Sequence, residues 1–361
     1  MKKRIAALTL ILAMTLAMAL AGCGDDATIQ TQSSGSASAS TPSSTSTVKP
    51  KSDALVLRFS GHSALGTPAT EYSTALCDEV AEETDGALVI EYYPYHQLGD
   101  SLQVFDEVIM GTIDMAMCGA NDSVCVLATS TLIPALATSY EDMEKLLQEG
   151  SYIDGVIGDA LDAVGIKYLG TFFGGITGVA TNKEAKAPAD PTVSKGVTIR
   201  SPTTTTFQAG LDALGFRAVS LGYSEIFSSL QTGVIEGYGG GMPHTVLTSF
   251  SEVITHYYDY NICSEGLPMM ISKKTWDEKL SQEYQNLLTD KFHKIIGESF
   301  GVYKAYEDDC SAQLREMGIE VVTFTDAERS AYEDHVREVA WPKLEDIYGK
   351  EFFDGLREAV A

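Results

Sequence analysis

Apolar and polar residues follow two different periods in the middle of the chain. In residues 197–200 apolar and polar side chains alternate, which is the period of a β-strand with two unlike faces. Residues 207–214 instead carry apolar side chains at helical spacing, and Gly215 follows as a helix stop. Residues 218–221 again form a short and largely apolar run. The pattern predicts a strand, a helix and a second strand.

The alternation of strands and helices continues for one more helix and one more strand. Ser224 is placed to cap a short helix, Gly233 to end it, and Val234 to begin a third strand. Strands that alternate with helices are typical of a parallel sheet covered by helices. We therefore predict an α/β fold for this part of the chain.

An earlier stretch repeats this order. Strands are predicted at 54–59, 88–93 and 112–117, with a helix face at 72–80 and a second helix capped by Asp100. The segments 108–114 and 230–236 also share a pattern, each with a glycine followed by an acid at its end. Two similar units predict two similar lobes that face each other across a cleft.

Further elements complete the two lobes. We expect strands at 166–173, 267–272 and 319–324, a long helix from Ser281 that spans both lobes, and a capping box at Thr325–Glu328. The predicted division is a signal peptide at 1–22, a linker at 23–52, lobe I at 53–176 plus 266–305, and lobe II at 177–265 plus 306–361.

Arg200 is the first candidate for a functional residue. It stands at the carboxyl end of its predicted strand, before Ser201 and Pro202 interrupt the strand. Ligands of open α/β sheets bind outside the carboxyl ends of strands, and a guanidinium fits a carboxylate or phosphate with two hydrogen bonds. The alternative is a surface arginine paired with an acid, which is easy to arrange in so acidic a chain.

Several motifs resemble those of the extracytoplasmic solute-binding proteins of TRAP transporters, the DctP-like family. Gly196–Pro202 resembles the family's Gly-x-Lys-x-Arg-x-Pro strand, with Thr198 in place of lysine, and Glu225–Gly237 resembles its following Leu-Tyr-x-Ala-Leu-Gln-x-Gly segment, with Glu236 in place of aspartate. The resemblance covers roughly residues 54–345 and includes Gln97–Gly99, Gly111–Asp114 and Lys273–Trp276.

The resemblance implies a two-lobed periplasmic-binding-protein-like (Venus flytrap) fold with hinge segments, in which Arg200 holds the ligand. The chain departs from the family where a second arginine is usual, since it has Gly175-Ile176-Thr177, and a ligand with two carboxylates is therefore less expected. Gly239–Gly241 would admit a ligand close to the backbone or form a plain turn. His62 follows the first strand as a ligand contact or a polar loop residue. The candidate ligand-binding residues are Arg200, Tyr223, Thr177, Phe173, Gly240, Asn121 and His62.

The amino terminus predicts export. A basic start is followed by the apolar run 5–20 and by Leu20–Cys23, which describes a secretory signal peptide better than a membrane span, because the apolar run is short. Leu-Ala-Gly-Cys resembles a bacterial lipobox, which implies cleavage before Cys23 and a lipid on its sulfur. The Ser- and Thr-rich stretch 28–51 is typical of a flexible tether.

Composition excludes several classes of function. The formal net charge of −25 argues against nucleic-acid binding, which requires basic patches. The six histidines show no zinc-ligand spacing, and no phosphate loop, dinucleotide fingerprint or nucleophile elbow is present, so we predict no metal, no cofactor and no catalytic residue. Cys77 is interpreted as a core residue, whereas Cys118 and Cys125 could form a disulfide that the sequence does not decide.

Together these features predict a lipid-anchored, extracytoplasmic protein that captures a small organic acid. The resemblance implies membrane subunits of a TRAP transporter as its partner, driven by an ion gradient. Two alternatives stay open, a secreted lipoprotein enzyme on the same scaffold and a sensor lipoprotein that presents its ligand to a receptor.

Overall fold

The computed structural model describes residues 48–137, 139–202 and 204–360. The predicted signal peptide, the lipidation site Cys23 and most of the predicted linker lie outside these residues. At the end of that linker, the backbone N–H of Lys51 already donates to the carbonyl of Gly86 at 3.0 Å. Within the described segments, no helix combines the length and the apolar character that a membrane span requires.

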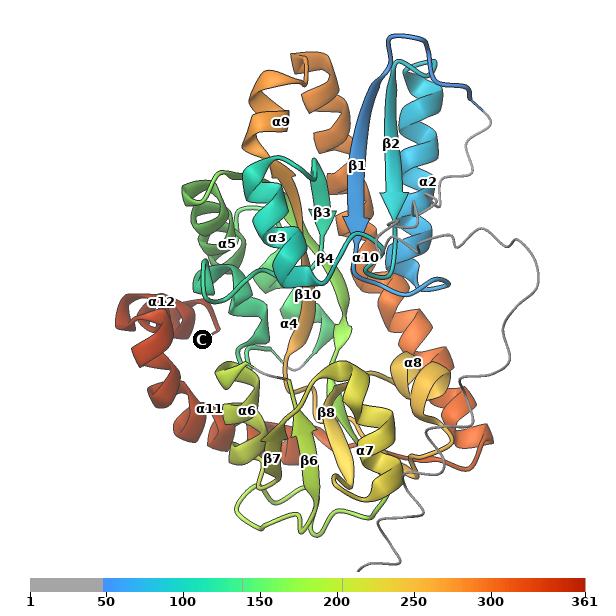
Figure 1. The fold of residues 1–361 in the computed structure, drawn as a ribbon. Coiled ribbons are helices and arrows are strands. Elements are labelled where there is room, and N and C mark those ends of the chain that lie inside the picture. Colours follow the sequence, from blue (N-terminus) through green and yellow to red (C-terminus); the bar gives the residue numbers. More distant parts are fainter. Residues whose placement is uncertain (1–47, 138, 203, 361) are drawn as a thin grey trace, which may run out of the picture. The chain divides into compact units, whose positions relative to one another are not determined.

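The first sheet, sheet A, is the centre of the predicted first unit (Figure 1). β1 pairs in parallel with β2 and β3, while β10 runs antiparallel to both β3 and β4. The strand order is β2 (Leu88–Tyr93), β1 (Leu55–Gly61), β3 (Met115–Met117), β10 (Ser264–Ser272) and β4 (Ile166–Ile176). Helix α2 (Pro68–Glu83) connects β1 to β2, and α3 (Ser101–Met110) connects β2 to β3. The predicted β-α-β-α-β order and the Asp100 cap are confirmed.

Sheet B contains the second unit and has the strand order β11-β9-β5-β8-β6-β7. β6 (Thr198–Ser201) pairs in parallel with β7 (Arg217–Ser220) and with β8 (Gly237–Gly241), and α6 (Thr205–Ala213), the 3₁₀ turn η2 (Tyr223–Glu225) and α7 (Ile226–Thr232) connect these strands. The remaining strands are β5 (Gly178–Thr181), β9 (His256–Tyr258) and β11 (Glu320–Val322).

Two boundaries in the second unit differ from prediction. Ser224 lies inside η2, and Glu225 is the residue that precedes α7. The third strand begins at Gly237 and not at Val234, because Ile235 is fully buried in a core cluster with Leu230 before the chain enters the sheet. The apolar pair 234–235 therefore reflected core packing and not strand pairing.

The repeated pattern at 108–114 and 230–236 has the same structural role in both units. Gly111 and Gly233 end α3 and α7 with φ values of 77° and 72°. Asp114 Oδ2 accepts the backbone N–H of Arg58 in β1 at 2.9 Å. Glu236 Oε2 likewise accepts the backbone N–H of Thr198 in β6 at 3.0 Å. Each acid attaches the chain that follows a crossover helix to the central strand of its unit.

Two segments cross between the sheets at adjacent positions. The chain leaves β4 and enters β5 through Thr177, and it leaves β9 and enters β10 through residues 259–263. The N–H of Thr177 donates to the carbonyl of Cys263 at 2.9 Å, and the N–H of Ile262 donates to the carbonyl of Thr177 at 2.8 Å. The two crossings therefore pair with each other.

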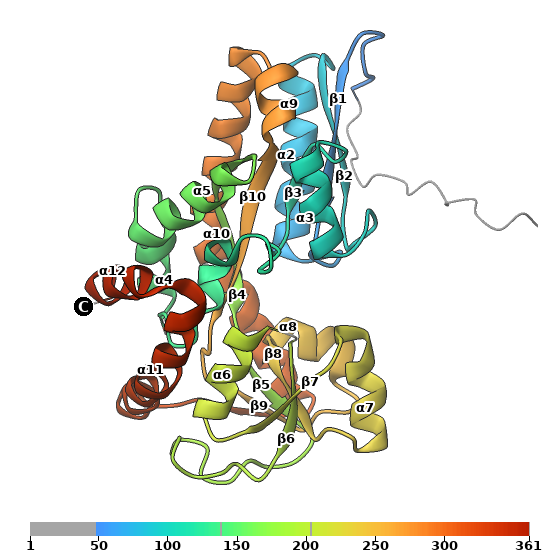
Figure 2. The same cartoon turned by 60° about the vertical axis from the view of Figure 1, so that its left-hand side comes forward.

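The long helix α10 (Gln282–Glu316) contacts elements of both sheets, as Figure 2 allows the reader to follow. It packs against β4 of sheet A and the neighbouring helix α2, and against β11 of sheet B and the short helix α8 (Pro243–Thr245). The predicted N-terminal residue Ser281 caps it by accepting the N–H of Tyr284. The sequence analysis predicts such a long helix, shared by the two units.

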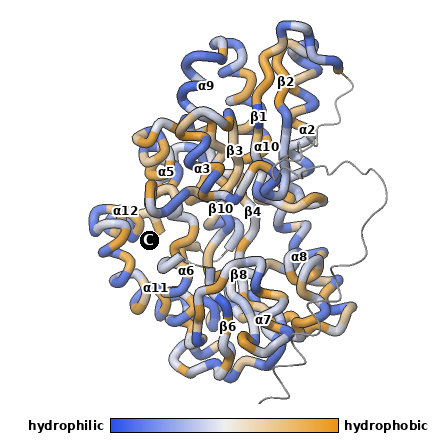
Figure 3. Tube along the Cα trace, in the orientation of Figure 1, coloured by the Kyte–Doolittle hydropathy of each residue, from blue (hydrophilic) through white to orange (hydrophobic). Residues whose placement is uncertain are grey.

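Each sheet has its own hydrophobic core. β1 and β2 are largely hydrophobic in Figure 3, and their inward side chains belong to the largest cluster of buried residues. That cluster also contains Trp341 and Phe352 from the C-terminal helices α11 (Asp326–Tyr348) and α12 (Lys350–Ala359), which the predicted division assigned to lobe II. Two smaller clusters fill sheet B. The shorter elements are η1 (Val126–Leu132), α4 (Tyr140–Leu147), α5 (Tyr152–Ala163), the π-helical turn η3 (Val246–Phe250) and α9 (Lys273–Glu278).

Candidate functional site

Arg200 lies near the carboxyl end of β6, beside the parallel strand β7. Its Nε donates to the carbonyl of Leu221 at 2.9 Å, and its Cζ lies 5.9 Å from the centre of the Tyr223 ring. Both partners belong to the loop that follows β7. The loop after the neighbouring strand therefore holds the guanidinium in place.

The guanidinium is buried but has no acidic partner. Arg200 is 8% exposed, and in the described part of the chain no carboxylate pairs with it and no acceptor is recorded for its Nη atoms. Burial lowers the pKa of Arg200 to about 10, while Tyr223 and Tyr238 act in the opposite direction. The group therefore stays charged at neutral pH. A buried charge that lacks its counter-ion is costly, and such a group is a strong candidate to receive an anion.

A second set of polar side chains comes from sheet A. His62 follows β1, and its Nδ1 lies 3.0 Å from Ser101 Oγ. The ring of His96 lies 4.6 Å from the ring of His62, measured between centroids. Tyr95 and His96 both have positive φ, at 49° and 59°, and their N–H groups donate to the carbonyls of Ser63 and Gly61. This tight turn fixes two aromatic side chains at the carboxyl end of β1.

Glu265, at the start of β10, contacts the second set. Its Oε1 lies 3.5 Å from Nε2 of His62. Burial raises the pKa of Tyr223, with Tyr95 and Glu265 acting in the same direction and Arg200 acting in the opposite one. Sequence analysis missed Glu265, because an isolated acid before an apolar strand carries no periodic or motif signal.

Behind Glu265 lies a buried ion pair. His244 in α8 and Glu307 in α10 contact each other through Nδ1 and Oε1, and both side chains are nearly inaccessible. Burial lowers the pKa of His244, but the hydrogen bond and charge of Glu307 outweigh this effect, so the pKa is raised overall. The pair joins α8 to α10.

The other predicted ligand residues lie in different environments. Thr177 is buried at the crossing, where its hydroxyl lies 3.1 Å from the carbonyl of Cys263 and donates to it. Phe173 is fully buried and stacks on Phe300. Asn121, in the loop after β3, uses its side chain for Ser123 and Asp106. None of these three is brought beside Arg200 by a recorded contact within the described residues.

The glycine run forms strand β8 and not a turn. An added Cβ at Gly239 would lie 2.6 Å from Leu211 Cδ1, and one at Gly241 would lie 2.8 Å from the Tyr238 ring. Gly240 has a φ of +83°, and a Cβ there would approach the Phe207 ring at 3.3 Å. Close packing around the strand is therefore sufficient to require these glycines.

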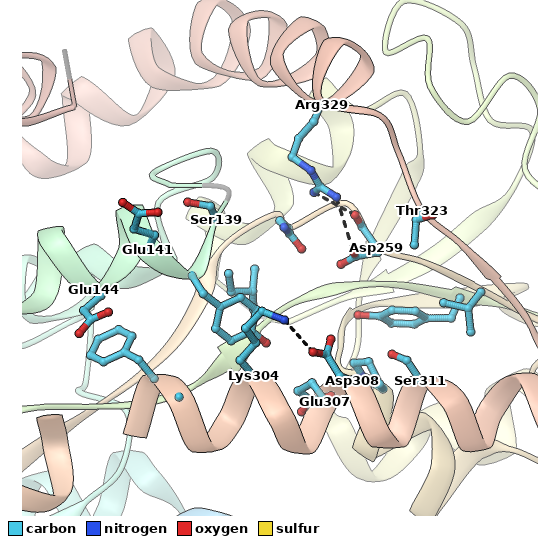
Figure 4. Close-up of a pocket in the computed structure, with 18 of the residues that line it drawn as sticks. Ser139, Glu141, Glu144, Asp259, Lys304, Glu307, Asp308, Ser311, Thr323 and Arg329 are labelled. Carbon is cyan, nitrogen blue, oxygen red and sulfur yellow. Dashed lines mark hydrogen bonds and ion pairs between the residues drawn. The ribbon is translucent and has the colours of Figure 1, made fainter. Parts of the chain in front are cut away.

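A large pocket lies elsewhere, and no predicted ligand residue lines it (Figure 4). It has a volume of about 750 Å³ and contains three cationic and five acidic side chains. Lys304 Nζ lies 2.6 Å from Asp308 Oδ2, and Arg329 Nη1 donates to the carbonyl of Asp259 at 3.1 Å. Because acids dominate and two of the cations are already engaged, this pocket is a poor site for an anion.

The described cysteines are buried and carry free thiols, and Cys77 packs in the core as predicted. This includes Cys118 and Cys125, for which a disulfide had been left open. Across the described ranges, no group of three or more His, Cys, Asp or Glu side chains is arranged to hold a metal ion.

Comparison with known families gives a match over most of the chain. The sequence model of DctP, the bacterial extracellular solute-binding proteins of family 7, matches residues 59–345. The C4-dicarboxylate-binding periplasmic protein DctP of Rhodobacter capsulatus is 24% identical over 321 residues, which are 87% of this chain and 94% of that protein. The 2,3-diketo-L-gulonate-binding periplasmic protein YiaO of Escherichia coli is 27% identical over 71% of this chain and 77% of its own. The match to a solute-binding protein of Roseobacter denitrificans is 25% identical and spans 58% of this chain and 63% of that protein.

Solved structures show the same fold. A TRAP periplasmic solute-binding protein from Ochrobactrum anthropi has a TM-score of 0.75 at 20% identity, covering 85% of this chain and 95% of that one. A TRAP periplasmic solute-binding protein from Pseudomonas putida, with bound D-glucuronate, has a TM-score of 0.73 at 21% identity over 85% and 97%. One from Shewanella oneidensis, with bound succinate, has a TM-score of 0.73 at 19% identity over 85% and 100%.

Proposed function

Because the chain belongs to the bacterial extracellular solute-binding proteins of family 7, the DctP-like receptors of TRAP transporters, we propose that it captures a small organic acid through Arg200. The observation that carries this proposal is the buried guanidinium without an acidic partner among the described residues. Its planar fork is suited to bind a carboxylate with two hydrogen bonds.

Two further observations support this class of ligand. Proteins of the same fold were solved with D-glucuronate and with succinate bound, and both molecules are carboxylates. Tyr223, which packs beside the guanidinium, offers an aromatic face to the carbon skeleton of such a ligand. We propose that the remaining predicted contacts, Thr177, Phe173, Gly240, Asn121 and His62, act in positioning or shaping this site.

The proposal includes a cycle of capture and delivery. The lobes, with the predicted boundaries, would close on the acid by bending at the paired crossings near Thr177 and Cys263, and the loaded form would dock on TRAP membrane subunits. A lipid on Cys23 would keep the receptor at the outer face of the membrane. The protein would not be an enzyme, and turnover of a bound acid would contradict the proposal.

The decisive experiment compares ligand affinity in Arg200 variants. A thermal-shift screen of organic acids, including D-glucuronate and succinate, identifies a ligand, since a molecule that binds the folded state raises the unfolding temperature. Arg200→Ala should then weaken binding by about two to four decades, because removing one partner of a buried charge pair costs about 3–5 kcal/mol. Arg200→Lys should recover only part of this loss, because it keeps the charge without the fork.

Arg217→Ala is the matched control. Arg217 stands on β7, opposite Thr198 in the neighbouring strand, and its guanidinium bonds Thr198 Oγ1. The control should retain wild-type affinity in calorimetry. Unchanged affinity in Arg200→Ala would exclude the assignment, and loss of the folded state without ligand would indicate a structural role instead.

A further inference from the structure

The peptide group between Leu221 and Gly222 connects the Arg200 guanidinium to a carboxylate. Its carbonyl oxygen accepts the Nε–H of Arg200 at 2.9 Å. Its N–H, which belongs to Gly222, donates to Oε2 of Glu225 at 2.9 Å. The described chain has no cis peptide bond, and a trans peptide is planar with its C=O and N–H pointing in opposite directions. The bond that fixes this N–H therefore also fixes the carbonyl that holds Arg200.

The sheet fixes Leu221 but not the peptide group that follows it. The N–H of Leu221 donates to the carbonyl of Ser201 at 3.2 Å, which continues the parallel pairing of β6 with β7. The chain then leaves the sheet at Gly222, which precedes η2. A Cβ on Gly222 would lie 3.0 Å from Oε2 of Glu225, so the glycine leaves room for the carboxylate. The orientation of the peptide group therefore depends on Glu225.

The bond at Nε determines which edge of the guanidinium is available to a ligand. A guanidinium binds a carboxylate in two-point fashion through its two Nη atoms or through Nε and one Nη. In Arg200 the carbonyl of Leu221 occupies Nε, and within the described ranges no acceptor is recorded for the Nη atoms. The Nη edge is therefore the one that can receive a carboxylate with two hydrogen bonds.

Glu225 also has a purely local role. Its carboxylate and its backbone N–H, which donates to the carbonyl of Gly222 at 3.2 Å, close the turn before α7. A cap that only stabilises this turn is the alternative reading. The carboxylate, however, bonds the same peptide group that holds Arg200, and it belongs to an exposed residue whereas the guanidinium is buried. It can thus orient the guanidinium without a direct ion pair that would compete with a ligand.

We propose that Glu225 is a positioning residue of the anion site. Through the peptide group between Leu221 and Gly222 it holds the guanidinium of Arg200 with the Nη edge toward the ligand. This inference rests on the proposed function, in which Arg200 binds the carboxylate of an organic acid.

A measurement without ligand tests the positioning itself. The Nε–H signal of Arg200 in a ¹H–¹⁵N NMR spectrum is identified by its loss in Arg200→Lys. Its exchange with water should be at least about 3-fold faster in Glu225→Ala than in wild type, because the acceptor of this N–H is no longer held in place. Glu225→Gln should stay within about 2-fold of wild type, since the amide oxygen still accepts from Gly222.

Calorimetry tests the consequence for binding. The probes are D-glucuronate, succinate, galactonate and orotate, which were bound in proteins of the same fold. For the probe that binds wild type most tightly, Glu225→Ala should weaken binding about 3- to 10-fold. Glu225→Asp should do the same because its side chain is one methylene too short, and Glu225→Gln should restore the affinity to within about 2-fold. Glu252→Ala, which removes an exposed acid beside the same core cluster, is the control and should change nothing.

The Arg200→Lys background separates positioning from a general effect of the turn. Lysine has no Nε–H for the carbonyl of Leu221 to hold, so Glu225→Ala should weaken binding much less in this background than in wild type. A cap that acts only on stability would lower the affinity by the same factor in both backgrounds, and that result would overturn the inference.

The outcomes also keep this inference apart from the proposed function. An unchanged Nε–H exchange rate in Glu225→Ala overturns the inference whether or not a probe binds. Unchanged affinity in Glu225→Ala, with a large loss in Arg200→Ala, overturns it and leaves the proposed function intact. If no probe binds while the exchange rate rises as expected, the proposed function fails for these acids and the orientation of Arg200 by Glu225 stands.

Discussion

Arg200 and Glu265 differ in how much the sequence alone shows about the surroundings of each residue. For Arg200, the place at the end of an alternating strand and the motif both predict a ligand contact, and this role stays a prediction. Glu265 has no such signal in the sequence, because its raised pKa comes from burial and its contact is with His62, which lies more than 200 positions earlier in the chain. The same limit applies to Phe173, where an aromatic residue after a strand gives no sign of whether it faces a ligand or the core.

The pKa of Glu265 makes a prediction about unliganded stability. The carboxyl has an ordinary pKa of 4.5 and a folded pKa of about 7, so between these values the folded state binds more protons than the unfolded state. Stability should therefore fall as pH rises from about 4.5 to 7 and stay lower above that range. Glu265→Gln should remove this dependence and be more stable than wild type at pH 7.5 by about 1–3 kcal/mol.

Urea unfolding of wild type, Glu265→Gln and Glu278→Gln at pH 5.0 and 7.5 measures the effect. The exposed control should follow wild type at both pH values. If Glu265→Gln loses as much stability as wild type between these two conditions, the carboxyl of Glu265 titrates in the folded protein as it does in the unfolded chain.

At the scale of elements, alternation and helical spacing were reliable where packing agreed with them. The two β-α-β-α-β units, the Asp100 cap and the Thr325–Glu328 capping box all form as expected. The exceptions have packing causes. Residues 239–241 form a strand because they pair with β5, and the side chains around them leave little room for a Cβ. Val234 precedes the strand, and Ile235 packs in the core. The local sequence does not show which side chains from distant parts of the chain pack around these residues.

The repeated acids Asp114 and Glu236 give a prediction about how elements are joined. Asp114 is 6% exposed and accepts from Arg58 N, Thr275 Oγ1 and Lys279 Nζ. Asp114→Ala should therefore cost about 3–5 kcal/mol, because it leaves a buried network without its acceptor. Glu236 is one-third exposed and bonds Thr198 N and Lys183, so Glu236→Ala should cost only about 1 kcal/mol.

Chemical denaturation of the two variants, with stability extrapolated to water, provides the comparison. The repeat predicts the same role for both acids, and their difference in burial predicts the order of the effects. A larger loss in Glu236→Ala than in Asp114→Ala would show that the difference in burial does not determine the order of the effects.

At the scale of the whole molecule, the structure brings His62 and Glu265 to 3.5 Å from each other, although they lie far apart in the sequence. Arg200 belongs to sheet B and His62 follows β1 of sheet A, while Glu265 stands in β10, directly after the segment that passes from one sheet to the other. The paired backbone at Thr177 and Cys263 is a narrow connection beside α10, which contacts both units. The sequence predicted two units and a shared helix, but the side chains at their junction depend on how the crossing segments pair.

The predicted anchor is a property of the whole molecule, and its test is independent of the binding site. If Cys23 carries lipid, Cys23→Ala should move the protein from the membrane fraction to the soluble fraction, because acyl chains supply the attachment and the acidic globule has no affinity for an anionic surface. Ligand affinity should stay at the wild-type value, since the binding groups lie in the described residues. Ser33→Ala, a change in the predicted linker, should leave both properties unchanged. Fractionation and mass measurement of the mature protein decide the question, and full membrane retention of Cys23→Ala would contradict the lipidation prediction.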